Sequence, residues 1–270
     1  MRVIVNKTKQ FLLLMVTALV VFSCSKDDES NILEKEQNQK VSQSDLKTIL
    51  QADDLSSVAD NVVAELFNNA ESGKQAKNND CYEAEYTDTG FTVTFPNCTI
   101  EGTDEKVNGT LTVVYAEEGD NYAFSVTYNN LMAGDICING TKSFGISAGE
   151  QENSIVLTTI GDMSIKMADG AVISEEGEKI VGIVFGEELG DGMLTIDGKW
   201  TVKADGNTYS VDITELLSTD FGCDYVGKGL MLLNKNGLAV TIDFGDGSCD
   251  DIAAVIYPDG TKEDITLEEK

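Results

Sequence analysis

The feature that most constrains the fold is a series of short alternating runs between residues 81 and 267. Segments that alternate apolar and polar residues are typical of strands that bury one face. Ten such segments occur here: 91–95, 110–115, 122–128, 154–160, 179–185, 194–202, 208–213, 237–244, 253–257 and 264–267. They predict a mainly β body over 80–270, an antiparallel meander that forms a curved sheet, a sandwich or an open barrel.

Turn signals separate these runs, because glycine, asparagine and aspartate adopt the backbone angles of tight turns. The signals are Asp88-Thr89-Gly90, Asn139-Gly140, Asp169-Gly170, Asp205-Gly206-Asn207, Lys235-Asn236-Gly237 and Pro258-Asp259-Gly260. We therefore expect hairpins at these positions.

One helical pattern precedes the β body. Apolar residues recur there at steps of three and four, which makes one apolar stripe: Leu55, Val58, Ala59, Val62, Val63, Leu66, Phe67 and Ala70. Asp53 and Asp54 suit the N-terminal end of this stripe, and Gly73 suits its stop. We predict an amphipathic helix within 44–73 that packs on the β body.

The spacing of four cysteines predicts two disulfides. A two-residue turn at Thr89-Gly90 pairs Asp88 with Phe91 and, further along the same ladder, Cys81 with Cys98. This pair falls at a non-hydrogen-bonded site, where side chains are close enough for a cross-strand disulfide.

The second disulfide follows from the same reasoning. A three-residue turn, 235–237, pairs Asn234 with Leu238 and then Cys223 with Cys249. The two cysteine hairpins also resemble each other, which is the pattern of a β body built from two related halves. Buried free thiols are the alternative, and Cys137 is expected to be a small buried residue.

The first thirty residues predict export. A basic start leads into an apolar run from Phe11 to Phe22, followed by Ser23 and Cys24. The run is shorter than the ~20 apolar residues that a spanning helix needs, so 1–23 reads as a signal peptide. The arrangement around Cys24 resembles a bacterial lipobox, which implies that Cys24 is lipidated and becomes the first residue. An uncleaved membrane anchor with an incidental thiol is the alternative.

The polar stretch that follows, 24–43, predicts a flexible acidic spacer after the lipidated cysteine. The run Cys-Ser-Lys-Asp-Asp-Glu is similar to the export tag of surface lipoproteins in the Bacteroidota. This resemblance implies an outer-membrane protein, anchored in membrane lipid, that faces the cell exterior.

The composition excludes several classes of function. Without residues 1–23 the chain keeps 16 lysines against 47 acids, a net charge of −31, and contains neither arginine nor histidine. Nucleic-acid binding depends on cationic contacts to phosphate, so we expect no nucleic-acid partner. A Ser-His-Asp triad and an imidazole-ligated zinc site are excluded as well. Such acidity favours cationic partners or hard cations, and a solvated acidic surface is the alternative.

Two candidate ligand sites remain. Asp243, Asp246, Asp250 and Asp251 cluster in DFGDGSCDD, a candidate oxygen-ligand loop for calcium that lacks the EF-hand order. A tight glycine turn with solvated acids is the alternative, and no other cofactor is expected. Trp200, the single tryptophan, is a candidate for stacking against a sugar, with a core position as the alternative.

The C-terminal stretch VTIDFGDGSCDDIAAVIYPDGTKEDITL resembles the ending of a group of uncharacterised Bacteroidota lipoproteins, in which an Asp-Phe-Gly-Asp-Gly-x-Cys-Asp box precedes a final hairpin. FPNCTIEGTDEKVNGTLTVVY is similar to another box of this group. The resemblance implies location and fold type and no activity.

Together these patterns predict a surface lipoprotein that is not an enzyme. Its expected role is to bind an unknown extracellular ligand or protein, or to make structural contacts, at the outer membrane exterior. The alternative is a carboxylate-dependent glycan hydrolase, since pairs of carboxylates can hydrolyse glycosidic bonds.

Overall fold

The computed structural model describes residues 40–68, 81–99, 106–117, 122–188 and 190–267, which belong to one compact unit, Gln39–Lys270. This part of the chain holds one helix, α2 (Gln43–Asn68), and thirteen strands. The strands are β1 (Glu83–Thr87), β2 (Gly90–Thr99), β3 (Lys106–Tyr115), β4 (Phe124–Ala133), β5 (Ile136–Ala148), β6 (Ser154–Lys166), β7 (Val172–Phe185), β8 (Gly192–Ala204), β9 (Asn207–Asp220), β10 (Lys228–Lys235), β11 (Leu238–Asp246), β12 (Ile252–Ile256) and β13 (Lys262–Thr266).

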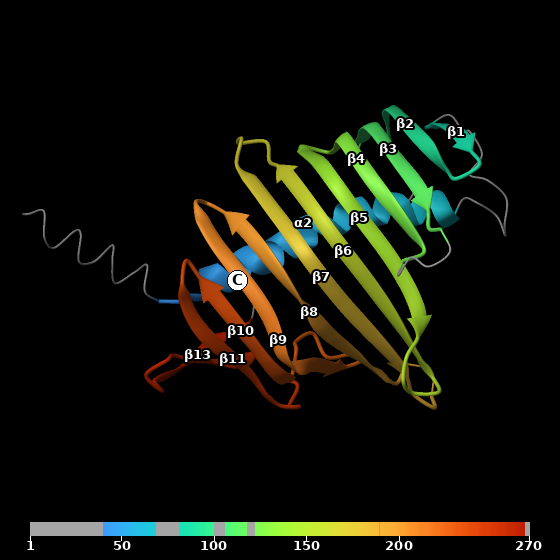
Figure 1. Ribbon diagram of the computed structural model, residues 1–270. Coiled ribbons are helices and arrows are strands. Elements are labelled where there is room, and N and C mark those ends of the chain that lie inside the picture. Colours follow the sequence, from blue (N-terminus) through green and yellow to red (C-terminus); the bar gives the residue numbers. More distant parts are fainter. Residues whose placement is uncertain (1–39, 69–80, 100–105, 118–121, 189, 268–270) are drawn as a thin grey trace, which may run out of the picture. The chain divides into compact units, whose positions relative to one another are not determined.

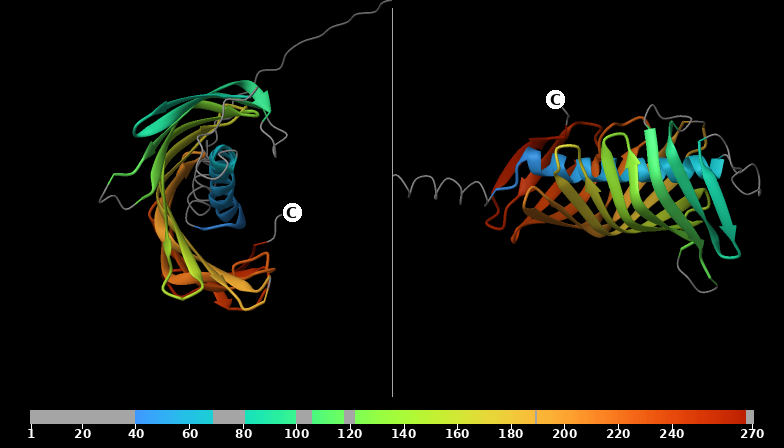
Figure 2. Two further views of the ribbon diagram at one scale, coloured as in Figure 1. Left: turned by 90° about the vertical axis from the view of Figure 1, so that its right-hand side faces the viewer. Right: turned by 90° about the horizontal axis from the view of Figure 1, so that it is seen from above.

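The strands form a single antiparallel sheet in sequence order, from β1 to β13 (Figure 1). The predicted antiparallel meander is therefore confirmed. The sheet is not closed, because β1 and β13 stand at its two ends. It curves around α2 (Figure 2), and we call the face toward the helix the inner face. Of the three predicted forms, the structure is the curved sheet.

Glycines inside strands make this curvature sterically possible. Gly177 in β7 and Gly198 in β8 have φ angles of 146° and 128°. A Cβ atom at Gly177 would clash with the backbone of Lys199 and Trp200. Only glycine adopts these angles and lets neighbouring backbones approach so closely.

The predicted turn at Asn139-Gly140 is wrong, because Gly140 is another glycine inside a strand. Both residues lie inside β5, where Gly140 pairs with Met163 of β6. Gly140 has a φ of 126°, and a Cβ there would clash with the carbonyl oxygen of Asp162. The glycine therefore serves a close approach between strands and not a chain reversal.

The core follows α2 along the inner face. The C-terminal half of the helix buries Ala59, Val62 and Leu66 against β2–β6, as its apolar stripe predicted. The N-terminal half buries other residues, among them Ile49, against β7–β12, and Leu55 touches both groups. The two halves expected from the cysteine hairpins are thus joined in one sheet and share one helix.

The helix begins at Gln43, one residue before the predicted bound of 44, and not near Asp53 and Asp54. Ser42 precedes its first turn, and the Asp45 carboxylate accepts hydrogen bonds from the Ser42 backbone N–H and hydroxyl, both at 2.8 Å. This is one half of a capping box, with aspartate at the third helical position, whose side chain reaches back to the Ser42 N–H. Asp53 and Asp54 lie in the middle of α2, and Gly73 lies outside the described residues.

The Cys81–Cys98 disulfide is present, with its Cα atoms 5.1 Å apart, but the predicted register of its hairpin is wrong. Thr87 pairs with Gly90, so the turn is Asp88-Thr89. Gly90 belongs to the strand, since a Cβ there would clash with the carbonyl oxygen of Val113. Cys81 precedes β1, and a bulge at Asn97 re-aims Cys98 toward it.

The Cys223–Cys249 disulfide is also present, with a Cα separation of 5.7 Å. Here too the predicted turn is wrong, because Lys235 pairs with Leu238 across the two-residue turn Asn236-Gly237. Both turn residues have positive φ, which is the geometry of a tight hairpin turn. The cysteines lie in the loops beyond β10 and β11, so the disulfide joins two loops and not two paired strands.

Candidate functional site

The N-terminal predictions concern residues that the structure does not describe. The signal peptide over 1–23, Cys24 and most of the spacer lie outside the described residues. Within the part that is described, α2 is not long and apolar enough to cross a membrane.

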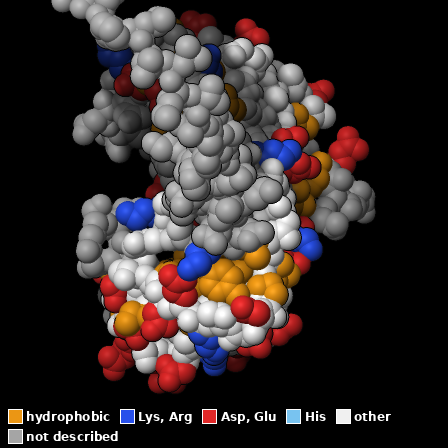
Figure 3. Space-filling view, turned by 90° about the vertical axis from the view of Figure 1, so that its left-hand side faces the viewer, with side chains coloured by type: hydrophobic (Ala, Val, Ile, Leu, Met, Phe, Trp, Pro, Cys, Tyr) orange, Lys and Arg blue, Asp and Glu red, His pale blue; other side chains and the backbone are white. Residues whose placement is uncertain are grey.

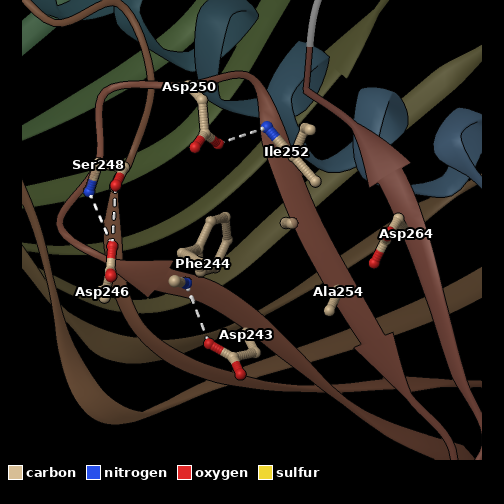
Figure 4. Close-up of a pocket in the computed structure, with 11 residues that line it drawn as sticks. Asp243, Phe244, Asp246, Ser248, Asp250, Ile252, Ala254 and Asp264 are labelled. Atoms are coloured by element: carbon tan, nitrogen blue, oxygen red, sulfur yellow. Dashed lines mark hydrogen bonds between the residues drawn. The ribbon is translucent and has the colours of Figure 1, made fainter.

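The predicted acidic loop lines a pocket of about 240 Å³ between the ends of β11, β12 and β13 (Figure 4). Asp243, Asp246 and Asp250 contribute to its wall, whereas Asp251 is not among the lining residues. The structure adds Asp264 from β13, which the sequence analysis missed. The registers of the last two hairpins put Asp264 in the same row of the sheet as Asp243, because Ala254 pairs with both residues.

The carboxylates of this loop hold its own turns together. Asp243 accepts a hydrogen bond from the Gly245 N–H at 3.0 Å, and Asp250 accepts one from the Ile252 N–H at 3.1 Å. Asp246 accepts from the backbone N–H and the hydroxyl of Ser248.

The hydroxyl and N–H of Ser248 lower the pKa of Asp246 below its usual value, so this exposed carboxylate remains ionised. In Figure 4 the four carboxylates stand on different sides of the pocket. No group of three or more acids or cysteines among the described residues could hold a metal ion.

Trp200 occupies the core position that was the alternative to ligand stacking. It lies on β8 with 9 % of its surface exposed, within the apolar cluster under the N-terminal half of α2. The Lys179 ammonium lies over its ring, 5.0 Å from the centroid. This ring face is therefore already in contact with a cation of the protein itself.

Cys137 is the one free cysteine among the described residues, and it is half-buried. It lies on β5 opposite Met132 of β4, one residue from the fully buried Ile138. Neighbouring strand residues point to opposite faces, so Cys137 faces away from α2.

The strongest electrostatic feature is a set of ion pairs between α2 and the inner face, which the sequence analysis missed. Three lysines from β10, β7 and β5 pair with three aspartates of the helix: Lys235 with Asp45, Lys179 with Asp53, and Lys142 with Asp60. The aspartates are eight and seven residues apart, or about two helical turns each, so they follow one side of α2. That repeat was visible in the sequence, but the sheet curvature that brings three distant strands to it was not.

The pair at the start of α2 is the most buried. Lys235 and Asp45 are 7 % and 4 % exposed, and their charged atoms are 2.8 Å apart. Tyr209 donates a further hydrogen bond to Asp45 at 2.9 Å. Burial alone would raise the pKa of Asp45, but the hydrogen bonds from Lys235, Ser42 and Tyr209 outweigh burial and lower the pKa. Burial together with Asp45 raises the pKa of Tyr209 to about 12.

In the other two pairs, burial and the opposite charge shift the pKa in opposite directions, and the stronger effect differs. Burial lowers the pKa of Lys179, yet Asp53 and Glu175 outweigh this effect and raise it. Burial raises the pKa of Asp60, and the attraction to Lys142, at 2.8 Å, does not fully offset it. All three pairs fix the position of α2 along the sheet.

The surface shows the acidity of the composition. On the face seen in Figure 3, acidic side chains lie at many points around an area of hydrophobic side chains.

Comparisons with protein families, with curated proteins and with solved structures found no match to this chain.

Proposed function

We propose that the chain is an outer-membrane lipoprotein, anchored through acylated Cys24 and facing the cell exterior, that binds a ligand or a protein there. The observation that carries this proposal is the basic, then apolar, then Ser23-Cys24 order of the first residues. One acyl chain gives only reversible membrane binding, so a cysteine with two or three chains is the anchor that this role requires.

The two disulfides support export. Disulfides persist in oxidising compartments outside the cytoplasm and are rare inside it. The Cys81–Cys98 and Cys223–Cys249 bonds staple the two ends of the sheet, where its short outer strands lie. A stapled sheet that holds its helix with three ion pairs, one of them buried, is a stable body for display on a short polar tether.

Acyl labelling of Cys24→Ala tests the anchor. Cells that express the full chain are grown with a labelled fatty acid, and the protein is isolated and counted. We expect labelling of the unchanged chain and none of Cys24→Ala. Cys137→Ala is the matched control, because Cys137 is free as well, and it should keep the label. Labelling that survives Cys24→Ala refutes the lipoprotein proposal.

Protease treatment of intact cells tests the exterior location. An added protease should remove the body of the acylated protein from intact cells, while a periplasmic marker in the same cells stays whole. A body that is cut only after the outer membrane is opened contradicts surface exposure and leaves the acyl anchor standing.

A further inference from the structure

The long central strands β5–β8 continue past α2, which covers only part of their length (Figure 1). Lys142 on β5 and Lys179 on β7 contact α2, so both side chains point to the inner face. Because side chains alternate along a strand, every second residue from Lys142 and from Lys179 also points inward. The pairing from β5 to β7 runs without a register shift. Directly paired residues share a face, so the inward positions beyond the helix can be identified.

A row of four paired residues crosses these strands beyond the ion pairs: Ile146, Leu157, Val181 and Ile196. Further along β7, Ile183 and Phe185 continue the same side. We call these six residues the open inner face. Ile146, Phe185 and Leu157 are 65 %, 48 % and 36 % exposed, and the other three are half-buried.

The open inner face is uncharged. Beyond Lys142 and Lys179, no inward position of β5, β6, β7 or β8 carries a charge on this side of α2. The chain as a whole has 47 acids, and none of them lies on this surface. Exposed apolar surfaces rimmed by polar residues are where proteins commonly bind partners.

The hairpin loops next to the open inner face are acidic and contain no lysine. The β5–β6 loop carries Glu150 and Glu152, and the β7–β8 loop carries Glu187, Glu188 and Asp191, all exposed. An apolar surface with an acidic rim is complementary to an occupant that is apolar on one side and cationic at its edges.

The fold also indicates the form of the occupant. Both sides of β6 and β7 are paired along their length, so these strands offer no free edge for an extended peptide to join at the open inner face. The inner face already accommodates one helix, since α2 lies on it with its apolar stripe inward. An amphipathic helix places its apolar side chains at similar spacings.

We propose that the open inner face binds a cationic amphipathic helix of a partner protein, beside α2. The inference deepens the proposed binding role and rests on that role alone, because none of its steps requires the acyl anchor. A protein that is acylated at Cys24 but fails the binding test would refute this inference and leave the anchor intact.

The test uses the chain from residue 24 onward and a synthetic helix of Leu and Lys, about 18 residues or ~27 Å long. Fluorescence anisotropy of the labelled peptide measures its affinity, and circular dichroism reports helix formation on binding. A peptide of the same length with Glu in place of Lys is the charge control. We expect the lysine peptide to bind and the glutamate peptide to bind at least about tenfold more weakly.

Paired variants locate the site. Ile146→Ser combined with Phe185→Ser removes apolar side chains from the open inner face, and should weaken binding of the lysine peptide about tenfold or more. Ile160→Ser combined with Val172→Ser is the matched control, because these residues are 43 % and 49 % exposed on the opposite face. Its affinity should stay within about twofold of the unchanged protein, since neither side chain faces the proposed site.

Charge variants test the rim. Glu187→Gln combined with Glu188→Gln should weaken the lysine peptide and reduce the salt dependence of its affinity. Glu83→Gln combined with Glu85→Gln changes the net charge equally on the distant β1 and should have a smaller effect.

Several results would overturn the proposal. The first is no binding of the lysine peptide, and the second is equal affinity for the lysine and glutamate peptides. The third is an affinity that falls with Ile160→Ser and Val172→Ser and not with Ile146→Ser and Phe185→Ser. If an uncharged alkyl detergent binds tightly and Glu187→Gln does not change its affinity, the open inner face is a site for neutral lipid. Concentration-dependent dimers that Ile146→Ser abolishes assign it to a second copy of this chain.

Discussion

Removal of the Asp45 carboxylate should unfold the protein far more readily than its place in the first turn of a helix would indicate. Asp45→Ala leaves the buried Lys235 ammonium without its counter-charge at 2.8 Å, and the Tyr209 hydroxyl without its acceptor. It also removes the acceptor of the Ser42 N–H and hydroxyl at the start of α2. Breaking a buried ion pair by removing one partner costs about 3–5 kcal/mol, and we expect a loss of this size.

A double-mutant cycle with Lys235→Met separates the loss of the ion pair from the loss of packing. Lys235→Met alone leaves Asp45 with three hydrogen bonds from Ser42 and Tyr209, and should cost about 1–3 kcal/mol. The double variant has no unpaired buried charge. It should therefore be no less stable than Asp45→Ala alone, so the two effects are strongly non-additive.

Trp200 makes the measurement direct. It is the single tryptophan, and it is buried in the same apolar cluster as Leu46 and Tyr209. Its fluorescence during urea unfolding gives the free energy of unfolding for all four proteins. A double variant that loses the sum of the two single losses would show that the pair is not coupled, and the reasoning would fail.

The pKa of Asp45 adds a pH signature to this prediction. Its pKa is lowered in the folded state, so its stabilisation is present above the unfolded pKa of ~3.9 and is lost as the pH falls through the folded pKa. The unchanged protein should therefore lose more stability than Asp45→Asn below about pH 4. Parallel pH profiles of the two proteins would contradict this assignment.

Three further predictions follow from the sheet and its staples. Gly177→Ala should cost about 2–4 kcal/mol in the free energy of unfolding, because its Cβ would clash with the Trp200 backbone, whereas Gly161→Ala on the neighbouring strand, where the nearest atom is 3.5 Å away, should change it by less than about 1 kcal/mol. Replacing Cys223 and Cys249 together with serine should cost about 2–4 kcal/mol by urea unfolding, and an unchanged midpoint would mean that this bond does not constrain the unfolded chain. The raised pKa of Tyr209, about 12, means that stability falls as pH rises from its ordinary value near 10 toward 12, and Tyr209→Phe should flatten this fall in alkaline melting curves.

The sequence determined the local features of this protein, because they depend on neighbouring residues. Alternation predicted the strands from β2 onward, with two exceptions: β5, whose Asn139-Gly140 pair was interpreted as a turn, and β10, which none of the ten segments covers. The apolar stripe predicted the buried side of α2 from Leu55 to Leu66. Cysteine spacing predicted both disulfides, although the turns used in that reasoning were wrong.

The errors at Gly90 and Gly140 share one physical cause. Glycine in a sequence signals freedom of the backbone, and a turn and a close approach between strands both use that freedom. Gly90 and Gly140 looked like turn residues and are strand residues whose missing Cβ admits a neighbouring backbone. Only the position of the adjacent strand distinguishes the two uses, and that position is not encoded locally.

The tertiary structure alone decided what the inner face can do. Lys142, Lys179 and Lys235 are far apart in the chain and look like ordinary charged residues of exposed strands, yet the curved sheet brings all three onto one helix. The same curvature lets α2 cover only part of the long strands and leaves an apolar surface beside it. Periodicity shows which residues share a face, whereas the path of a helix across thirteen strands depends on contacts between distant parts of the chain.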